Sequence, residues 1–245
     1  MRDISAALLE HYNKAKEKFP HTTILGVFLY GSQNYNIATE DSDVDTIAIL
    51  IPSFDDLVLR TPISEEIHFE NGEHCVVKDI REVVKQWKKQ SLNYLEILFT
   101  KHYILNPQWK EMWNYFVDIK EDIAHMNKNL TIKSIIGQAK HTFIQNRFDK
   151  KKQANALRMY YFLKAFLSGK SYEECLTDSW EKTLAIKTNK EPFPFHSIKE
   201  FFDELDDIKE KNKDLFSLDK KTDDKMNVYL VWIVYHNMPN KITIH

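Results

Sequence analysis

The spacing of apolar residues changes along the chain, and this change limits the folds that the chain can adopt. Residues 22–30 and 45–51 are β-branched, aromatic or apolar runs, which predicts two strands. Beyond residue 109 nothing resembles a strand for long, and the apolar residues recur at helical spacing. The pattern predicts an α+β fold, with a small mixed sheet flanked by helices in residues 1–106 and an all-helical domain in residues 107–245.

Three local patterns add detail to the first part of the chain. Residues 4–19 have the apolar spacing of an amphipathic helix. Asn71-Gly72, between the strand-like residues 67–69 and 74–77, is the strongest short signal for a hairpin turn. A helix is predicted from Asp79, which suits the N-cap position. In the second part, helices are predicted over residues 110–117, 130–148, 151–168, 171–186, 196–211 and 222–236.

The composition excludes several classes of protein. The 245 residues are 43% hydrophobic and 29% charged, as in an ordinary soluble protein, and the net charge of −2 requires any nucleic acid to meet a local basic face. Cys75 and Cys175 match no metal-ligand spacing and are expected to be reduced thiols. The first residues have no signal-peptide core, and no apolar run is long enough to span a membrane. We therefore expect a cytoplasmic protein with no membrane partner.

Polar residues with related chemistry follow the first predicted strand and begin the second. Gly31 allows a turn whose N–H groups can face an anion, and Ser32 adds a hydroxyl donor. Asp43 and Asp45 are two residues apart, so on a strand their carboxylates point to the same side. A divalent cation between them removes their repulsion, and Mg²⁺ combines carboxylates with phosphate oxygens and water. The spacing predicts a metal–triphosphate site, in which Ser42 could orient an aspartate.

The residues GSQNYNIATEDSDVDTIAIL, positions 31–50, resemble the Gly-Ser and Asp-x-Asp signature of the DNA polymerase β-like nucleotidyltransferase superfamily. The likeness is greatest to a bacterial and phage branch of predicted nucleotidyltransferases. SLNYLEILF at 91–99 and KKQANALR at 151–158 resemble later segments of the same family. Together these segments cover about residues 20–170.

The resemblance implies that residues 1–106 form a nucleotidyltransferase core and that residues 107–245 complete its nucleotide cleft. It implies transfer of a nucleoside monophosphate from a nucleoside triphosphate, with ATP one candidate, to an acceptor, with Mg²⁺ or Mn²⁺ as cofactor and pyrophosphate released. Asp43 and Asp45 would be the catalytic metal ligands. The residues implied in nucleotide binding are Gly31, Ser32, Ser42, Lys151, Lys152 and Arg158. Neither the acceptor (a protein, an RNA end or a small molecule) nor the oligomeric state is indicated.

The chain departs from the family pattern at the third acid, which the neighbouring strand, here 73–79, usually supplies. From the alternation of side chains along a strand, we expect this acid near His74 or Val76, and neither residue is acidic. His74 could bind the metal or act as a base, and Glu73 or Asp79 could reach the site through a bulge. Without a third acid, the alternative is a catalytically degenerate relative that binds a nucleotide or a partner. A nucleic-acid-binding helical module is a further alternative.

Two sets of charged residues have an ordinary explanation beside the functional one. Lys151, Lys152 and Arg158 belong to a basic stretch of the kind that usually faces solvent, although positive charges near a triphosphate would be useful. Glu96 lies among apolar residues, where a structural partner such as a backbone N–H would account for it. His74 can likewise be an ordinary strand residue.

Overall fold

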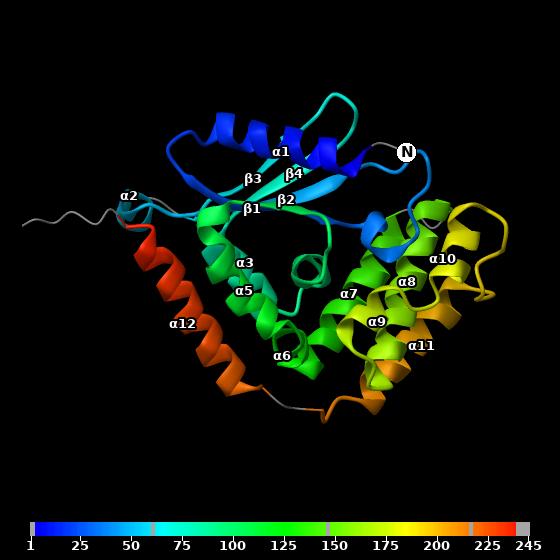
Figure 1. Cartoon of the computed structure of the whole chain (residues 1–245). Helices are drawn as coiled ribbons and strands as arrows, with labels where there is room; N and C mark the ends of the chain where they lie inside the picture. The colour runs from blue at the N-terminus through cyan, green and yellow to red at the C-terminus, as the bar shows by residue number, and fades with distance from the viewer. Residues whose placement is uncertain (1–2, 60–61, 146–147, 216–217, 239–245) are drawn as a thin grey trace, which may run out of the picture.

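The computed structural model describes residues 3–59, 62–145, 148–215 and 218–238, in which a mixed five-stranded sheet packs against helices (Figure 1). The strand order is β3-β4-β2-β1-β5, with β2 and β4 parallel and the other neighbours antiparallel. The strands are β1 (Thr23–Tyr30), β2 (Asp45–Ile51), β3 (Ser64–His68), β4 (His74–Asp79) and β5 (Tyr103–Leu105). A small mixed sheet within a mixed α/β fold, as predicted, is confirmed.

The two strands predicted from apolar runs are neighbours in the middle of the sheet. Nearly all residues of β1 and β2 are buried, as expected for strands covered on both faces. Their register pairs Tyr30 with Asp45, where β1 ends and β2 begins. The residues that follow Tyr30 therefore lie beside Asp45.

The predicted hairpin is present as β3 and β4, which pair antiparallel from Ser64↔Lys78 to His68↔His74. Gly72 in its turn has φ of +87°, a left-handed conformation that glycine adopts without strain. The parallel pairing of β4 with β2 aligns Cys75 with Thr46. His74 thus stands level with Asp45.

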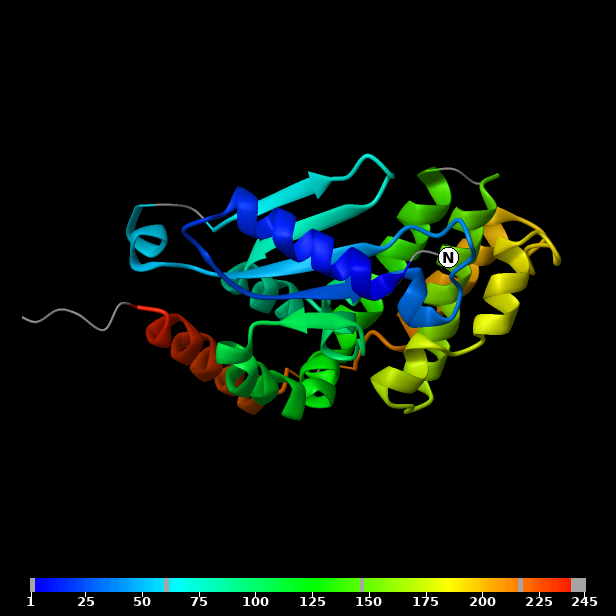
Figure 2. The same cartoon turned by 45° about the horizontal axis from the view of Figure 1, so that its top comes forward.

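Helices cover both faces of the sheet (Figures 1 and 2). The predicted first helix is α1 (Ile4–Lys18), which packs on β1, β2, β4 and β5. The helix predicted from Asp79 is α3 (Ile80–Lys88), which contacts β2 and β4. Alternate residues of β2 join different apolar clusters: Ala48 and Leu50 pack with α1, whereas Ile47 and Ile49 pack with Trp87 of α3 and later helices.

The later part of the described chain is helical, apart from the short strand β5. The other helices are α2 (Phe54–Leu59), α4 (Leu92–Leu95), α5 (Lys110–Asp118), α6 (Lys120–His125), α7 (Lys128–Gln145), α8 (Lys150–Leu167), α9 (Tyr172–Leu176), α10 (Trp180–Lys187), α11 (Ile198–Lys211) and α12 (Lys220–His236). The helix predicted over 171–186 is two helices, because Ser179 between them has φ of +53°. Residues 146–147 of the helix predicted over 130–148 lie outside the described residues.

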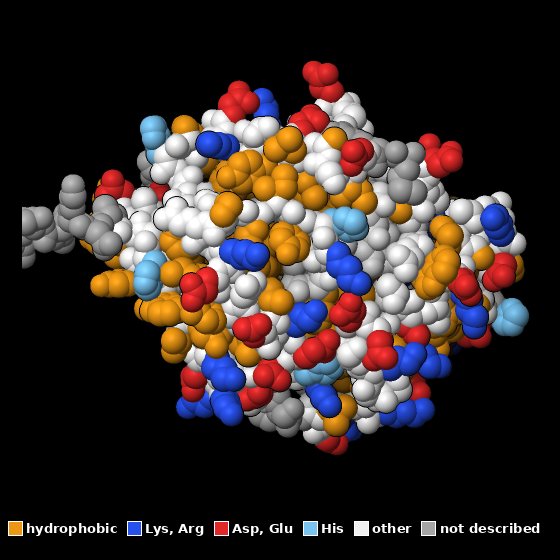
Figure 3. Space-filling view, viewed as in Figure 1, with side chains coloured by type: hydrophobic (Ala, Val, Ile, Leu, Met, Phe, Trp, Pro, Cys, Tyr) orange, Lys and Arg blue, Asp and Glu red, His pale blue; other side chains and the backbone are white. Residues whose placement is uncertain are grey.

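One apolar cluster extends from Leu25 of β1 to Ile233 of α12, on both sides of position 106. The sheet face opposite α1 and the later helices therefore share a hydrophobic core. Apolar side chains also lie on the surface of α12, at the lower left of Figure 3; the exposed ones include Val228, Val231, Trp232 and Tyr235. None of the described helices is both long and apolar enough to cross a membrane.

Candidate functional site

A cavity of about 190 Å³ lies between the end of the sheet where β2 begins and helices α7, α8 and α10. The predicted residues that line it are Gly31, Ser32, Asp43, Asp45, Lys151, Lys152 and Arg158. Lining residues that were not predicted include Tyr35, Asn93, Gln138, Asn155 and Lys187. The fold thus brings the glycine–serine segment, the two acids and the basic residues of α8 to one place.

Residues 31–37, called the glycine turn below, connect β1 to the loop before β2. Gly31 has φ of +93°, which disfavours any side chain at this position. A short 3₁₀ helix, Ser32–Tyr35, follows directly. The turn is closed by hydrogen bonds from Asn34 N–H to Gly31 O (2.9 Å) and from Ile37 N–H to Ser32 O (3.2 Å). The turn is therefore a compact structure held partly by its own backbone.

The N–H of Gly31 donates a hydrogen bond to Glu96 Oε1 at 2.6 Å. Glu96 is fully buried, and the expectation that it has a backbone N–H as structural partner is confirmed. The Gly31 N–H itself is therefore directed to Glu96 and not to the cavity. Gly31 contributes the shape of the turn, whereas the Ser32 hydroxyl makes no hydrogen bond to any described residue.

Asp43 and Asp45 both line the cavity, as their spacing predicts. Each has a cationic or ionisable neighbour: Lys151 Nζ lies 3.5 Å from Asp43 Oδ2, and His74 Nδ1 lies 2.8 Å from Asp45 Oδ1. The side chains of Asp43 and Asp45 are 39% and 28% exposed, so both can be reached from solvent. A metal ion that binds here must compete with these neighbours for the carboxylate oxygens.

His74 is engaged at both ring nitrogens. Besides the contact of Nδ1 with Asp45, its Nε2 lies 2.7 Å from the hydroxyl of Tyr30. The hydrogen bond with Asp45 raises the pKa of His74, against the opposing effect of burial. The ring is therefore held as a partner of Asp45, and it would have to give up a contact before it could bind a metal ion.

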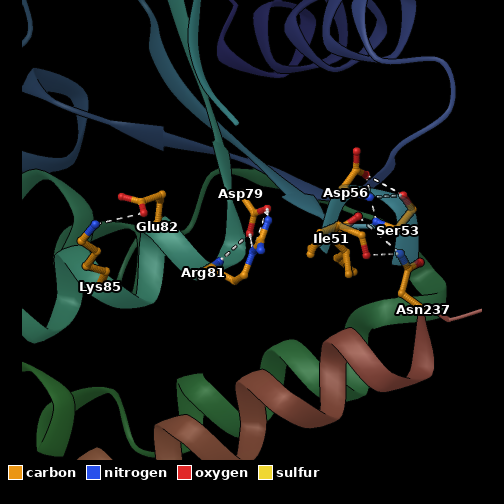
Figure 4. A network of polar contacts seen from close by, with 9 residues as sticks. Ile51, Ser53, Asp56, Asp79, Arg81, Glu82, Lys85 and Asn237 are labelled. Atoms are coloured by element: carbon orange, nitrogen blue, oxygen red, sulfur yellow. Dashed lines mark hydrogen bonds and ion pairs between the residues drawn. The ribbon is translucent and has the colours of Figure 1, made fainter. Parts of the chain in front are cut away.

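Asp79 has a different role from the metal ligand considered above (Figure 4). Its side chain accepts a hydrogen bond from Arg81 N–H at 2.8 Å, as the N-cap of α3. It also accepts from the Arg81 guanidinium, with the shortest distance 2.6 Å from Nη2 to Oδ2. Asp79 is 2% exposed and does not line the cavity. The alternative that placed it at the metal is therefore wrong, whereas its N-cap role is confirmed.

Glu73, the other acid considered, also lies away from the cavity. Its Oε2 is 3.2 Å from Nε2 of the buried His11 on α1. His11 contacts Thr46 through Nδ1 at 2.8 Å, so this polar group lies on the α1 side of the sheet. Strand parity explains the result, because Glu73 and His74 point to opposite faces.

The residues present fit a divalent cation that arrives with a triphosphate. Within the described ranges, no group of three or more His, Cys, Asp or Glu side chains is arranged to hold a metal ion. Mg²⁺ is commonly bound by one or two carboxylates, with phosphate oxygens and water as its other ligands. Asp43 and Asp45 supply two such oxygen donors, and Mn²⁺ accepts the same ligands.

Lys187 of α10 is a site residue that sequence reasoning missed. Its ammonium donates to Ile37 O at 2.8 Å and to Ser42 Oγ at 3.0 Å. Burial, followed by the nearby Lys151, lowers its pKa. Ser42 does not line the cavity, and its Oγ also accepts from Thr39 N–H at 2.8 Å. Ser42 therefore organises the loop before β2, and nothing local in the sequence distinguishes Lys187 from the other lysines.

Arg158 is buried at the cavity and does not face solvent, unlike a typical residue of a basic surface stretch. It is 3% exposed, its guanidinium stacks 3.7 Å from the centre of the Tyr35 ring, and its Nε donates to Asn155 Oδ1 at 3.2 Å. Its Nη1 is buried and has no hydrogen-bond partner among the described residues. Arg158 thus supports the glycine turn and retains a donor for a ligand.

The arrangement has one acidic and one basic edge. Asp43 and Asp45 stand at the start of β2, and Lys151, Lys152, Lys187 and Arg158 stand on the helices opposite. Such a cavity can hold a polyanion on the basic edge and a divalent cation on the acidic edge.

No model of a known protein family matches the chain, and no curated protein matches it either.

Proposed function

We propose that the protein is a Mg²⁺-dependent nucleotidyltransferase, which moves a nucleoside monophosphate from a nucleoside triphosphate to an acceptor. The observation that carries the proposal is the placement of Asp43 and Asp45 in one cavity with three basic side chains of α8. A triphosphate is the ligand class that needs both edges at once, because it carries several negative charges and binds Mg²⁺. Mn²⁺ is the natural substitute for Mg²⁺ in such a site.

The basic side chains would bind and orient the triphosphate. Lys151 stands nearest to the acids, 3.5 Å from Asp43, and can turn to a phosphate when a metal ion takes over that carboxylate. Arg158 offers its unpaired Nη1 from the deeper part of the cavity. The Ser32 hydroxyl is a further donor. Fixed cations around a transferring phosphoryl group stabilise the charge that develops in the transition state.

The proposed reaction forms one bond and breaks one. An acceptor oxygen attacks the α-phosphorus, the bond from that phosphorus to the β-phosphate oxygen breaks, and pyrophosphate leaves. The acceptor's proton passes to a base at the acidic edge, where Asp45 stands and His74 can share the charge at 2.8 Å. A bound Mg²⁺ would supply charge neutralisation and a lower pKa for the attacking hydroxyl. The chain's residues contribute mainly positioning.

The test is release of labelled pyrophosphate from each of the four nucleoside triphosphates, with a cell extract as the pool of acceptors. We expect release and label transfer with Mg²⁺ or Mn²⁺, none with EDTA, and none from the Asp43→Asn variant. Asp41→Asn is the matched control, because Asp41 is exposed and does not line the cavity. Release that survives Asp43→Asn would refute the proposed role of the acidic edge.

A second candidate function is nucleotide binding without turnover. It is favoured by His74, which occupies the position beside Asp45 where a third acid is expected. A binder of this kind would gain thermal stability from a triphosphate with Mg²⁺, yet would release no pyrophosphate with any acceptor. Thermal shift and pyrophosphate release measured on the same sample separate the two functions.

A further inference from the structure

We propose that Glu96 is a positioning residue for the triphosphate: it holds the glycine turn in place by accepting the Gly31 N–H from the protein interior. The inference rests on the proposed nucleotide-binding function of the cavity. Glu96 begins the short 3₁₀ helix Glu96–Leu98, directly after α4, and its Oε1 lies 2.6 Å from Gly31 N. Its neighbours in sequence, Leu95 and Ile97, are buried apolar residues.

Glu96 can influence a ligand in the cavity only through other residues. It is fully buried and does not line the cavity, whereas Gly31 does. A buried carboxylate is unfavourable unless its partners compensate for lost hydration. Here the partner that it contacts is a backbone N–H at the first residue of the turn. The contact therefore connects the interior to the edge of the site.

Two other charged side chains hold the same turn. The Arg158 guanidinium stacks on Tyr35 at 3.7 Å, and Lys187 donates to Ile37 O at 2.8 Å. Together with Glu96, they hold the start, the middle and the end of the glycine turn. Arg158 and Lys187 also line the cavity, so variants at those positions would change ligand contacts and turn geometry together. A Glu96 variant, by contrast, changes the geometry of the turn without removing a side chain that lines the cavity.

The geometry of the turn matters because Gly31 stands beside the metal-binding edge. Tyr30 is paired with Asp45 across β1 and β2, and a Cβ added to Gly31 would lie 3.9 Å from Asp45 Oδ2. The position of Ser32 relative to Asp45 thus depends on how Gly31 is held. Without an acceptor at Glu96, the half-buried Gly31 N–H would lose its hydrogen-bond partner in the protein, and the turn would move to recover one.

Two substitutions distinguish reach from the ionisable group at this position. Glu96→Gln keeps an acceptor oxygen at the same reach and removes the carboxyl group, whereas Glu96→Asp keeps a carboxyl group and withdraws it by one methylene. Ile97→Val is the matched control, since it also removes one methylene from a buried side chain of the same helical turn. For each variant, the dissociation constant of a nucleoside triphosphate with Mg²⁺, the melting temperature and the hydrogen exchange of the turn are measured.

The positioning role predicts opposite outcomes for the two variants. Because Glu96→Asp withdraws the acceptor of the Gly31 N–H, this variant should bind the triphosphate about tenfold more weakly, with faster exchange at Gly31. Glu96→Gln and Ile97→Val should stay within about threefold of the unmodified protein. Weak binding by Glu96→Gln with normal binding by Glu96→Asp would overturn the inference in favour of a role for the ionisable carboxyl group itself.

Three further outcomes are equally decisive. If all three variants bind the triphosphate equally well, the positioning role is wrong while the proposed function stands. If the unmodified protein binds no triphosphate with Mg²⁺ present, the proposed function is wrong and this inference falls with it. If Ile97→Val loses both affinity and melting temperature to the same extent as Glu96→Asp, the effect is one of general packing, and the specific role of Glu96 is wrong.

Discussion

The acidic and basic edges of the cavity are positioned by different parts of the fold. Asp45 begins β2 and Asp43 lies two residues before it, and the register of β2 with β1 places Asp45 beside Gly31. The basic residues come from α8 and α10, which pack on each other and, through α8, on α7. The two acids and the three basic residues of α8 each lie in a short stretch that can be recognised in the sequence, whereas Lys187 of α10 reaches the basic edge only through helix packing.

The two edges also differ in how freely their side chains can meet a ligand. Asp43 and Asp45 are partly exposed and have neighbours that a metal ion can displace. Lys151 is 65% exposed, whereas Lys187 and Arg158 already support the glycine turn. The basic edge thus combines an exposed lysine with side chains that hold the glycine turn, and variants should separate the two kinds.

Asp45→Asn should have the largest effect on activity, because it removes charge from the proposed metal site. We expect pyrophosphate release to fall by about 100-fold or more. Stability should change little, since the side chain is partly exposed. Steady-state rates and melting temperature, measured together, check this expectation. An active Asp45→Asn variant would remove the acidic edge from the proposal.

Asp79→Asn should lower stability and spare activity, the reverse of Asp45→Asn, because Asp79 is buried and lies outside the cavity. It loses part of the N-cap of α3 and the ion pair with Arg81, for which we expect a loss of about 1–3 kcal/mol in the free energy of unfolding. Urea denaturation measures this loss. Activity per folded molecule should be unchanged. A loss of activity without a loss of stability would mean that Asp79 does contribute to the site.

Lys187→Met should weaken triphosphate binding about tenfold, because it removes both a cation and the hydrogen bond to Ile37 O. Lys182→Met is the control on the same helix, where the lysine is exposed and does not line the cavity. Titration calorimetry with Mg²⁺ and a triphosphate compares the two. Equal affinities would mean that α10 does not belong to the basic edge.

The stability of the protein should depend on pH through Glu96. Burial raises the pKa of Glu96 from 4.5 to about 8, and Arg158 only partly opposes this. The folded state then keeps a proton that the unfolded chain releases, so stability from this group is complete below pH 4.5 and decreases as the pH rises towards 8. Tyr172 and Tyr30, which also face Glu96, have raised pKa values and stay neutral over this range.

The comparison that checks this pH dependence is urea unfolding of the unmodified protein and of Glu96→Gln between about pH 5 and pH 8. The slope of the free energy of unfolding against pH should be less negative in Glu96→Gln. Parallel curves would show that Glu96 does not take up a proton on folding.

Lys152→Met should have the smallest effect of the set. Lys152 lines the cavity, but it is only half-buried, and within the described ranges its ammonium donates to Gln145 Oε1 alone, at 3.3 Å. Exposed charges are screened by salt, so the loss in triphosphate affinity should be about twofold to threefold and should shrink at high ionic strength. A larger, salt-independent loss would mean that Lys152 is a direct, desolvated phosphate ligand.

Several local features could be predicted because neighbouring residues decide them. The runs at 22–30 and 45–51 are β1 and β2, Asn71-Gly72 is the turn of the β3–β4 hairpin, and Asp79 caps α3. The strand β5 was missed because its three residues depend on pairing with residues 26–28 rather than on their own pattern. The contact of Ser42 with Lys187 could not be predicted, because Lys187 is far away in the sequence.

The sequence by itself determined the glycine turn and the pair of acids, because backbone preference at Gly31 and the close spacing of Asp43 and Asp45, at the entry to β2, act over a few positions. The tertiary structure alone decided that Glu96 holds Gly31, that His74 pairs with Asp45 and Tyr30, and that Arg158 and Lys187 meet the same turn. These contacts join segments brought together by strand pairing and helix packing. Burial and hydrogen bonding at such places depend on the whole core, so no local pattern contains them.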